Sequence, residues 1–297
     1  MPLRDAPALG PYRLIRTLGQ GSVGVVHLAI DSRTRQALAL KVLTLGHDLS
    51  ESDHALAREH FLGEFRTARR LSHPDIVTLY DAGEQDGTAW LAMELLSGCE
   101  LGRYTRRPRL LPEPVVLALG ARLARALAHA HALGVVHRDI KPANVMVDLP
   151  AGQLKLTDFG VAGLADLSRT RTGVVLGTPH YMAPEQLAGA PADARSDLYS
   201  LGVLLFQLLT GRLPHEQASL GELLRAVARE PAPDLLGLRP ELSPALAAVV
   251  AQALQKQPAQ RHADAHRLAD ALFDLASASG SGPHMLLDPG AKATPGA

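Results

Sequence analysis

The sequence has a single cysteine, Cys99, in 297 residues. One thiol cannot close a disulfide within the chain, and it cannot supply the several thiolates of a cysteine-based zinc site. The sequence therefore excludes a disulfide framework and a cysteine-based zinc site. Such sparing use of cysteine favours a reducing, cytoplasmic compartment.

The chain also lacks an excess of charge of either sign. Its 30 basic residues balance its 30 acidic residues. A balanced chain has no global field that would attract nucleic acid or an anionic membrane surface. We therefore expect neither of these as a partner.

Long hydrophobic runs are missing as well. The longest, residues 198–209, is shorter than the roughly 20 apolar residues that a membrane helix needs, and it contains Ser200 and Gln207. Residues 1–12 show no apolar stretch behind a basic start, so no signal peptide is expected. We expect a soluble chain without a membrane span, in which residues 198–209 form a buried helix.

The first half of the chain has the pattern of a small β-rich lobe. With 46% hydrophobic and 20% charged residues, the chain is an ordinary globular protein of about two lobes. Short apolar runs separated by turn residues predict strands, and apolar residues at helical spacing predict one helix over residues 55–71. The predicted strands span residues 12–15, 25–30, 36–43, 76–81 and 90–95.

The pattern changes to helix after Gly98. Apolar residues at helical spacing, a proline at the start and a glycine at the end predict a helix over residues 113–133. Residues 197–210 are almost wholly apolar, which predicts a central buried helix. Three further helices are predicted at residues 219–229, 243–256 and 263–276. The Gly-, Ser- and Pro-rich residues from 277 onward predict disorder.

A glycine pattern lies between the first two predicted strands. Gly19, Gly21 and Gly24 are followed by Val26, which gives G-x-G-x-x-G-x-V. The same glycines mark dinucleotide-binding proteins, but there a helix follows the glycines. Between two strands they instead predict a hairpin that covers phosphates, with a plain surface turn as the alternative.

Lys41 lies inside an apolar predicted strand. Lysine is seldom buried without a partner. Lys41 is therefore either a solvated residue on an edge strand or a functional residue with an acidic partner. Two acidic residues of the predicted helix, Glu64 and Glu59, are candidates for an ion pair that would aim Lys41 at phosphates.

The octapeptide from His137 to Asn144 carries the strongest chemical signal. Asp139 can orient a hydroxyl and accept its proton late, Lys141 can offset phosphate charge, and Asn144 offers an amide oxygen to a hard cation. Asp158 opens the tripeptide Asp-Phe-Gly after a β-like stretch and is a second carboxylate for a metal. Together these motifs fill the roles of a phosphoryl-transfer site.

Over residues 11–275 the sequence resembles the bacterial Hanks-type serine/threonine protein kinases. It is similar in layout to the kinase domains of mycobacterial receptor kinases but has no transmembrane helix. The resemblance implies an α+β, bilobal protein-kinase fold. A small antiparallel β-sheet lobe with one helix (residues 11–95) would lead through a hinge near 94–98 to a larger, mainly α-helical lobe (99–275). Residues 1–10 and 276–297 would be flexible tails.

The resemblance also implies ATP and Mg²⁺ as cofactors, with Mn²⁺ as the alternative metal. Asn144 and Asp158 would hold the metal, and Asp139, Lys141 and Lys41 would be catalytic. Glu64 is preferred over Glu59 because nine residues separate it from His73, as the family's pattern requires. Met93 would be the gatekeeper, or an ordinary core methionine. The full ATP set would be Leu18, Gly19, Gly21, Gly24, Val26, Ala39, Lys41, Glu64, Met93, Glu94, Leu96, Asn144, Met146 and Asp158.

Further residues are implied in structure and regulation. Asp197 would anchor the backbone of the catalytic loop, and Arg261 would pair with Glu185 of the Ala-Pro-Glu motif, unless Arg261 is a solvated helix-end charge. Arg138 would receive a phosphate added to Thr170 or Thr172, which would order the activation loop. Thr178, like Lys141, implies serine/threonine rather than tyrosine acceptors.

The predicted function is that of a non-specific serine/threonine protein kinase. Its expected partners are protein substrates with Ser or Thr acceptors and a second copy of the chain, acting in trans through a transient dimer. A catalytically silent scaffold is disfavoured because Lys41, Asp139 and Asp158 are all present. A small-molecule phosphotransferase of related fold would lack the Ala-Pro-Glu segment, whereas a peptide-binding platform with incidental catalysis stays open.

Overall fold

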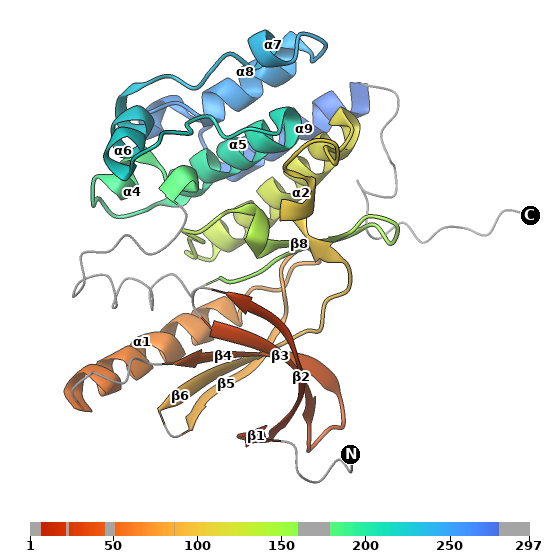
Figure 1. The fold of residues 1–297 in the computed structure, drawn as a ribbon, viewed down its shortest axis with the longest axis vertical. Helices are drawn as coiled ribbons and strands as arrows, with labels where there is room; N and C mark the ends of the chain where they lie inside the picture. The colour runs from red at the N-terminus through yellow and green to blue at the C-terminus, as the bar shows by residue number, and fades with distance from the viewer. Residues whose placement is uncertain (1–6, 22–23, 45–50, 86, 160–178, 279–297) are drawn as a thin grey trace, which may run out of the picture. The chain divides into compact units, whose positions relative to one another are not determined.

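The chain folds into two compact units (Figure 1). The computed structural model describes residues 7–21, 24–44, 51–85, 87–159 and 179–278. The first unit contains the described residues up to Ser72, then Val77–Leu96 and Phe159. The second contains His73–Ile76, Ser97–Asp158 and the described residues from 179 onward. The first is built on a sheet and the second mainly on helices, so the fold is α+β.

The first unit is an antiparallel sheet with one helix. Its strand order is β1-β2-β3-β4-β6-β5, and helix α1 (Glu51–Ala68) packs against β5. The sheet core is built on Tyr12 and Trp90, whose rings meet edge to face at 5.0 Å. The strands are β1 (Ala8–Leu9), β2 (Tyr12–Gly21), β3 (Gly24–Asp31), β4 (Ala37–Thr44), β5 (Leu79–Gln85) and β6 (Thr88–Met93).

Most elements predicted for this half are present, with one displacement. Residues 76–81 were expected as a strand, but β5 begins only at Leu79 and runs through polar residues to Gln85. Ile76 instead makes an isolated bridge to Leu156 within the second unit. The predicted boundaries of this strand were therefore wrong.

Helix α5 (Ala194–Thr210) is the centre of the second unit, and all its residues from Ser196 onward are buried. The Asp193 carboxylate caps its first turn by accepting hydrogen bonds from the amides of Arg195 and Ser196, at 2.8 and 3.1 Å. Glycine lets α2 (Glu113–Ala132) approach closely, because a Cβ on Gly120 would lie 2.7 Å from Leu205 Cδ2. The central buried helix was predicted correctly.

The other helices of this unit surround α5. Helix α9 (Ala265–Ala278) packs along α2, and α8 (Pro244–Ala253) packs on both α5 and α9. Three helices fall within or close to their predicted ranges: α6 (Leu220–Arg229), α8 and α9. The short helices α4 (Pro184–Leu187) and α7 (Leu235–Leu238) were not predicted. No helix in the described part of the chain is long and apolar enough to cross a membrane.

A small sheet and several 3₁₀ turns complete the second unit. Strands β7 (Cys99–Glu100), β8 (Val145–Asp148) and β9 (Gln153–Leu156) form it, and β8 is the middle strand. The 3₁₀ turns are η1 (Leu101–Tyr104), η2 (Pro142–Asn144), η3 (Pro179–Tyr181) and η4 (Pro258–Gln260).

The segment His73–Ile76 belongs to the second unit although its neighbours in sequence belong to the first. Arg122 donates through Nε to both carboxylate oxygens of Asp75, at 3.1 and 3.2 Å, and both side chains are buried. The amide of Leu156 donates to the Asp75 carbonyl at 2.8 Å. A buried ion pair therefore fixes this short segment within the helical unit.

Candidate active site

The octapeptide loop of residues 137–144 is held by a buried carboxylate. Asp197, near the start of α5, is 1% exposed and accepts hydrogen bonds from the backbone amides of His137 and Arg138, both at 2.8 Å. His131 Nε2 lies 2.8 Å from the same carboxylate. Three donors thus satisfy the charge of Asp197, as a buried carboxylate requires.

Arg138 has a strained backbone within this loop. Its φ of 69° is unusual for a residue with a side chain. Its amide donates to Asp197, and its carbonyl accepts a hydrogen bond from Gln186 Nε2 at 3.2 Å. Backbone strain of this kind costs about 1–3 kcal/mol and persists where surrounding contacts enforce it. The loop conformation is therefore imposed by α5 and by the Ala-Pro-Glu segment.

The imidazole of His137 joins the loop to the end of β9. This side chain is fully buried. Its Nδ1 accepts the backbone N–H of Asp139 at 3.3 Å, so the ring proton lies on Nε2, which donates to the Thr157 carbonyl at 2.8 Å. The amide of Thr157 in turn donates to the Asn144 carbonyl at 2.9 Å. Thr157 directly precedes Asp158, so these bonds fix where the Asp-Phe-Gly motif begins.

Three of the predicted site residues meet around one carboxylate. Lys141 Nζ donates to Asp139 Oδ2 at 2.7 Å, and Asn144 Nδ2 donates to the same oxygen at 2.9 Å and to the Asp139 carbonyl at 2.7 Å. Because both partners of Asn144 are acceptors, its amide nitrogen must face them and its oxygen must face away. The Asp139 carboxylate is 35% exposed and stays accessible to a reactant.

Asn144 and Asp158 are the two predicted metal ligands, and both have side-chain oxygen atoms. The amide oxygen of Asn144 points away from Asp139. Asp158 directly follows Thr157, whose amide donates to the Asn144 carbonyl. Asp158 also has a left-handed backbone, with φ of 66°. Oxygen donors of this kind suit a hard cation. Over the described ranges, no group of three or more His, Cys, Asp or Glu residues is placed to hold a metal by itself, so other ligands would have to complete the shell.

Glu185 and Arg261 form a bidentate ion pair. Nη1 of Arg261 donates to Glu185 Oε1 and Nη2 to Oε2, both at 2.7 Å. Ser196 Oγ donates to Oε1 at 2.7 Å. Burial raises the pKa of Glu185, but the bonds from Arg261 and Ser196 outweigh it and hold this pKa below its ordinary value. Arg261 is 3% exposed, so it is not a solvated helix-end charge.

Most of the remaining described candidates lie in the first unit, on its sheet and helix. Strand register pairs Gly19 with Val26 and Val26 with Lys41. It also pairs Ala39, two residues from Lys41, with Met93. Directly paired residues share a face of a sheet, so all five lie on the same face. Lys41 and Met93 are buried, at 7% and 6% exposure.

The hairpin context of the glycines is also clear. β2 and β3 are antiparallel, with Gly21 opposite Gly24. A Cβ on Gly24 would lie 2.2 Å from the Val42 carbonyl oxygen, so glycine is required there. Leu18 is an exposed residue of β2. A strand rather than a helix follows the glycines, which rules out the dinucleotide fingerprint.

Two expectations for the first unit become sharper. On α1, Glu64 is half-buried whereas Glu59 is exposed, and a buried lysine needs a sheltered partner. The amide of Glu94 already donates to the Thr78 carbonyl at 3.0 Å, so an amide offered to a ligand here would come from Leu96. In the second unit, Met146 lies on β8. Thr170, Thr172 and Thr178 lie outside the described residues.

Sequence reasoning missed several residues that support the site. His131 contacts Asp197, Ser196 contacts Glu185, and Gln186 contacts the backbone of Arg138. His137 was part of the octapeptide but was given no role. Polar residues on otherwise apolar helices, such as His131 on α2 and Ser196 on α5, are the signal that could have revealed them.

Known proteins resemble the chain along most of its length. The family model described as the protein kinase domain matches residues 12–273. The serine/threonine-protein kinase PknD of Mycobacterium tuberculosis is 38% identical over 272 residues, which are 91% of this chain and 40% of PknD. PrkC of Bacillus subtilis is 35% identical, over 85% of this chain and 38% of PrkC. The chain thus spans less than half the length of these curated relatives.

A solved structure supports the same assignment. The crystal structure of the Mycobacterium tuberculosis PknI kinase domain has a TM-score of 0.73 and 31% sequence identity. The match covers 92% of this chain and 99% of that one. With the anchored loop, the ion pair of the Ala-Pro-Glu motif and the glycine hairpin, these similarities establish that the chain belongs to the protein kinase family.

Proposed function

We propose that the chain is an ATP-dependent serine/threonine protein kinase that transfers the γ-phosphoryl group to Ser or Thr hydroxyls of proteins. The observation that carries the proposal is the Asp139 carboxylate. It is partly exposed, lies against Lys141 and Asn144, and projects from a loop whose backbone is bonded to the buried Asp197. Family membership and the names of the relatives support the same function.

Asp139 orients the acceptor hydroxyl and takes its proton late in the reaction. A carboxylate is a weak base, so positioning contributes more than early deprotonation. Lys141, at hydrogen-bond distance from Asp139, neutralises charge on the transferred group and the developing alkoxide. The loop is hydrogen-bonded to Asp197 in the absence of substrate, and this pre-organisation lowers the cost of reaching the transition state.

Mg²⁺ is the metal that we assign, with Mn²⁺ as a substitute, and Asn144 and Asp158 would hold it. The metal supplies charge neutralisation to the phosphates of ATP. Within the first unit, Leu18, Val26, Ala39, Met93 and the backbone of Glu94 and Leu96 are assigned to adenine, and the hairpin glycines Gly19, Gly21 and Gly24 would cover the phosphates. Within the second unit, Met146 is assigned to the same nucleotide. Lys41 would contact the α- and β-phosphates, and Glu64 is the residue assigned to position it.

Regulation is assigned to the activation loop. Phosphorylation of Thr170 or Thr172 provides an anion for Arg138, whose loop contains Asp139, and so couples the loop to the catalytic carboxylate. Thr178 and Lys141 select Ser and Thr acceptors. A second copy of the chain is the expected trans substrate for this step. The kinase domain spans residues 11–275, with a smaller lobe at 11–95 and a larger one at 99–275.

Asp139→Asn tests the proposal. The amide keeps the shape of the side chain and can still accept hydrogen bonds from Lys141 and Asn144, but it cannot take the proton. We expect transfer of labelled phosphate from ATP to the protein itself and to a generic Ser/Thr protein substrate to fall at least about a hundredfold. Asp270→Asn is the matched control, because Asp270 is an exposed residue of α9.

Phosphate transfer by Asp139→Asn at the wild-type rate would contradict the assignment. Thermal unfolding of both variants separates a catalytic effect from misfolding, and we expect both to unfold close to the wild-type temperature. A wild-type protein that binds ATP with Mg²⁺ but transfers no phosphate, to itself or to any protein, would indicate a scaffold instead.

A further inference from the structure

The second unit has a compact basic surface beside the catalytic loop, the arginine segment, made up of Arg103, Arg106, Arg107 and Arg109. It begins within η1, which contains Arg103, and ends before α2. All four arginines are exposed. Within the described part of the chain, none of the four side chains forms an ion pair or a hydrogen bond. Four cations within seven residues are unusual in a chain whose overall charge is zero.

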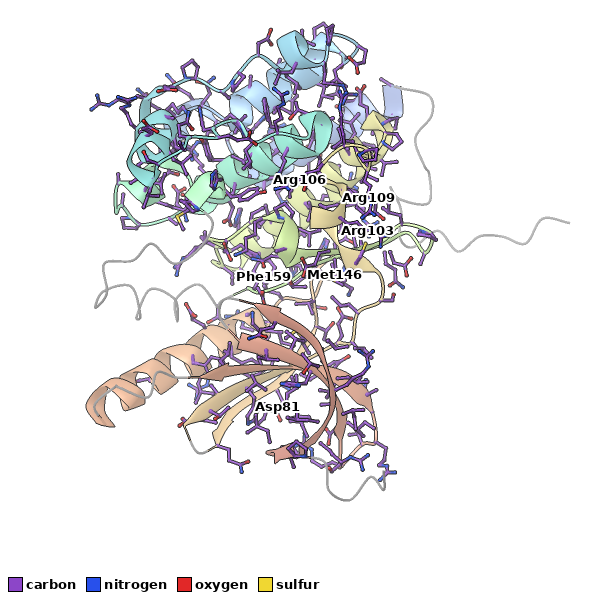
Figure 2. All side chains as sticks on the ribbon, in the orientation of Figure 1. Asp81, Arg103, Arg106, Arg109, Met146 and Phe159 are labelled. Carbon is purple, nitrogen blue, oxygen red and sulfur yellow. The ribbon has the colours of Figure 1, made fainter. Side chains whose placement is uncertain are left out.

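The backbone of the arginine segment is ordered. Thr105, buried within it, donates from its amide and its hydroxyl to the Gly102 carbonyl, at 3.4 and 2.9 Å. The amide of Arg109 donates to the Arg106 carbonyl at 2.9 Å. Figure 2 shows Arg103, Arg106 and Arg109 gathered where this segment leaves the small sheet. The cations are therefore presented from a fixed turn, and a ligand would lose little freedom by ordering it.

The arginine segment begins close to the loop that contains Asp139, Lys141 and Asn144. The turn η1 packs against η2, which ends in Asn144, and against β8. A Cβ on Gly102 would lie 3.7 Å from Pro142 Cβ. Arg106 is also close enough to Tyr181 for its charge to affect the pKa of the phenol, and Tyr181 lies four residues before Glu185. Burial raises the pKa of Tyr181 to about 12, and the positive charge of Arg106 opposes this rise.

Few carboxylates oppose this charge. Glu100 and Glu113 flank the arginine segment in sequence, and Glu241 lies close enough to Arg107 for that cation to help lower the pKa of Glu241, after its own backbone and Arg239. Arg107 is thus partly compensated. Arg103, Arg106 and Arg109 are left as a positive surface, and their potentials add because exposed charges within about 10 Å are only partly screened.

We propose that the arginine segment docks an acidic stretch of the protein substrate, so that this kinase prefers Ser or Thr acceptors accompanied by Asp or Glu. The proposal rests on the proposed function and names the substrate class for it. Guanidinium groups bind carboxylates through paired N–H donors, which suits a peptide rich in Asp or Glu. A nucleic-acid surface would interleave aromatic side chains, but Tyr104, the aromatic residue here, is half-buried and faces Cys99.

The test compares two labelled peptides, each with a single Thr. One carries glutamates around the Thr and the other carries glutamines. Binding is followed by fluorescence anisotropy and transfer by kcat and KM. The triple variant R103Q/R106Q/R109Q should weaken binding of the glutamate peptide and raise its KM about tenfold, equivalent to 1.4 kcal/mol, with kcat unchanged. The glutamine peptide and the KM for ATP should change less than about twofold.

The control variant is R225Q/R229Q/R267Q, which removes three exposed arginines of the same unit from α6 and α9. It should keep the preference for glutamate. Charge reversal in R103E/R106E/R109E should shift the preference to a peptide with lysines around the Thr. Added salt should erode the wild-type preference.

Equal binding of both peptides by the wild type, or equal loss of preference in the control variant, would overturn the proposal. So would tighter binding of duplex DNA or of anionic phospholipid vesicles than of the glutamate peptide, if that binding is also lost in the triple variant. Anisotropy with Asp139→Asn keeps the two questions apart. If the wild type binds the glutamate peptide but transfers no phosphate to the peptide, to itself or to a generic protein substrate, the kinase assignment is refuted and the acidic docking surface stands.

Discussion

Replacing Arg261 should destabilise the helical unit more than most single changes. Arginine has five N–H donors, and all five are used here. Two go to Glu185, and Nε, Nη1 and Nη2 also donate to the carbonyls of Gln255, Arg195 and Lys256, at 2.8, 2.9 and 3.1 Å. The guanidinium also lies 5.0 Å from the centre of the Tyr199 ring. Its removal would leave a largely buried carboxylate and three carbonyls without these donors.

Breaking a buried ion pair from one side costs about 3–5 kcal/mol. Because methionine keeps the length of the stem, we expect Arg261→Met to lower the free energy of unfolding by about 3–4 kcal/mol. For a chain of this size that corresponds to roughly 10 °C in the unfolding temperature. Urea and thermal unfolding, followed by circular dichroism, measure both quantities.

The double variant Glu185→Met with Arg261→Met provides the decisive comparison. Removing both charges leaves no isolated carboxylate, so at least half of the lost stability should return. Losses that simply add, or a loss below about 1 kcal/mol in Arg261→Met, would refute the reasoning. The pH dependence gives a second check. The pKa of Glu185 is lowered on folding, so its stabilising effect is complete above 4.5 and should disappear as the pH falls below that value.

Two further predictions concern other parts of the chain. Burial, and then the charge of Lys256 at 3.1 Å from Nε2, lower the pKa of His215 from 6.5 to about 4. The unfolded chain therefore binds a proton between these values that the folded chain does not, and the free energy of unfolding should fall by about 1–2 kcal/mol as the pH drops from 6.5 to 4. His215→Gln should remove this acid sensitivity, whereas the control His266→Gln, at an exposed position, should retain it. Urea unfolding at several pH values measures the free energy of unfolding for each variant. The same pH dependence in His215→Gln and in the wild type would contradict the prediction. In the sheet, Gly24→Ala should cost about 2 kcal/mol or more because its Cβ would overlap the Val42 carbonyl oxygen, whereas Gly21→Ala, 3.9 Å from its nearest contact, should cost less than about 1 kcal/mol in the same assay.

The elements predicted best from sequence were those with strong periodicity and clear ends. Helices α2 and α5 have long apolar faces and end at a glycine in the left-handed region, Gly134 for α2 and Gly211 for α5. Strand β5 was misplaced because the apolar stretch before Tyr80 looked like a strand. In the structure the polar residues from Asp81 to Gln85 pair with β6, because neighbouring strands rather than local propensity select them.

The candidate reacting groups could be predicted from the sequence, but the residues that support them could not. Asp139, Lys141 and Asn144 are neighbours in sequence, so their grouping could be inferred from one short loop. The contacts of His131 and His137 cross 66 residues to Asp197 and 20 to the Thr157 carbonyl, respectively. A single sequence contains no signal for the tautomer of a buried histidine or for which backbone carbonyl it meets.

The ion pair between Arg122 and Asp75 limits how this chain can be divided. A fragment that begins after the first unit, at Ser97, would look like a complete helical piece in sequence. It would, however, contain Arg122 without Asp75, and so a guanidinium buried in the helical unit would lose its carboxylate. A protein made from the helical unit alone, or one in which the sheet unit is exchanged for that of a relative, should therefore keep residues 73–76 together with the helical unit. The two units therefore alternate along the sequence, and no single cut in the chain separates them.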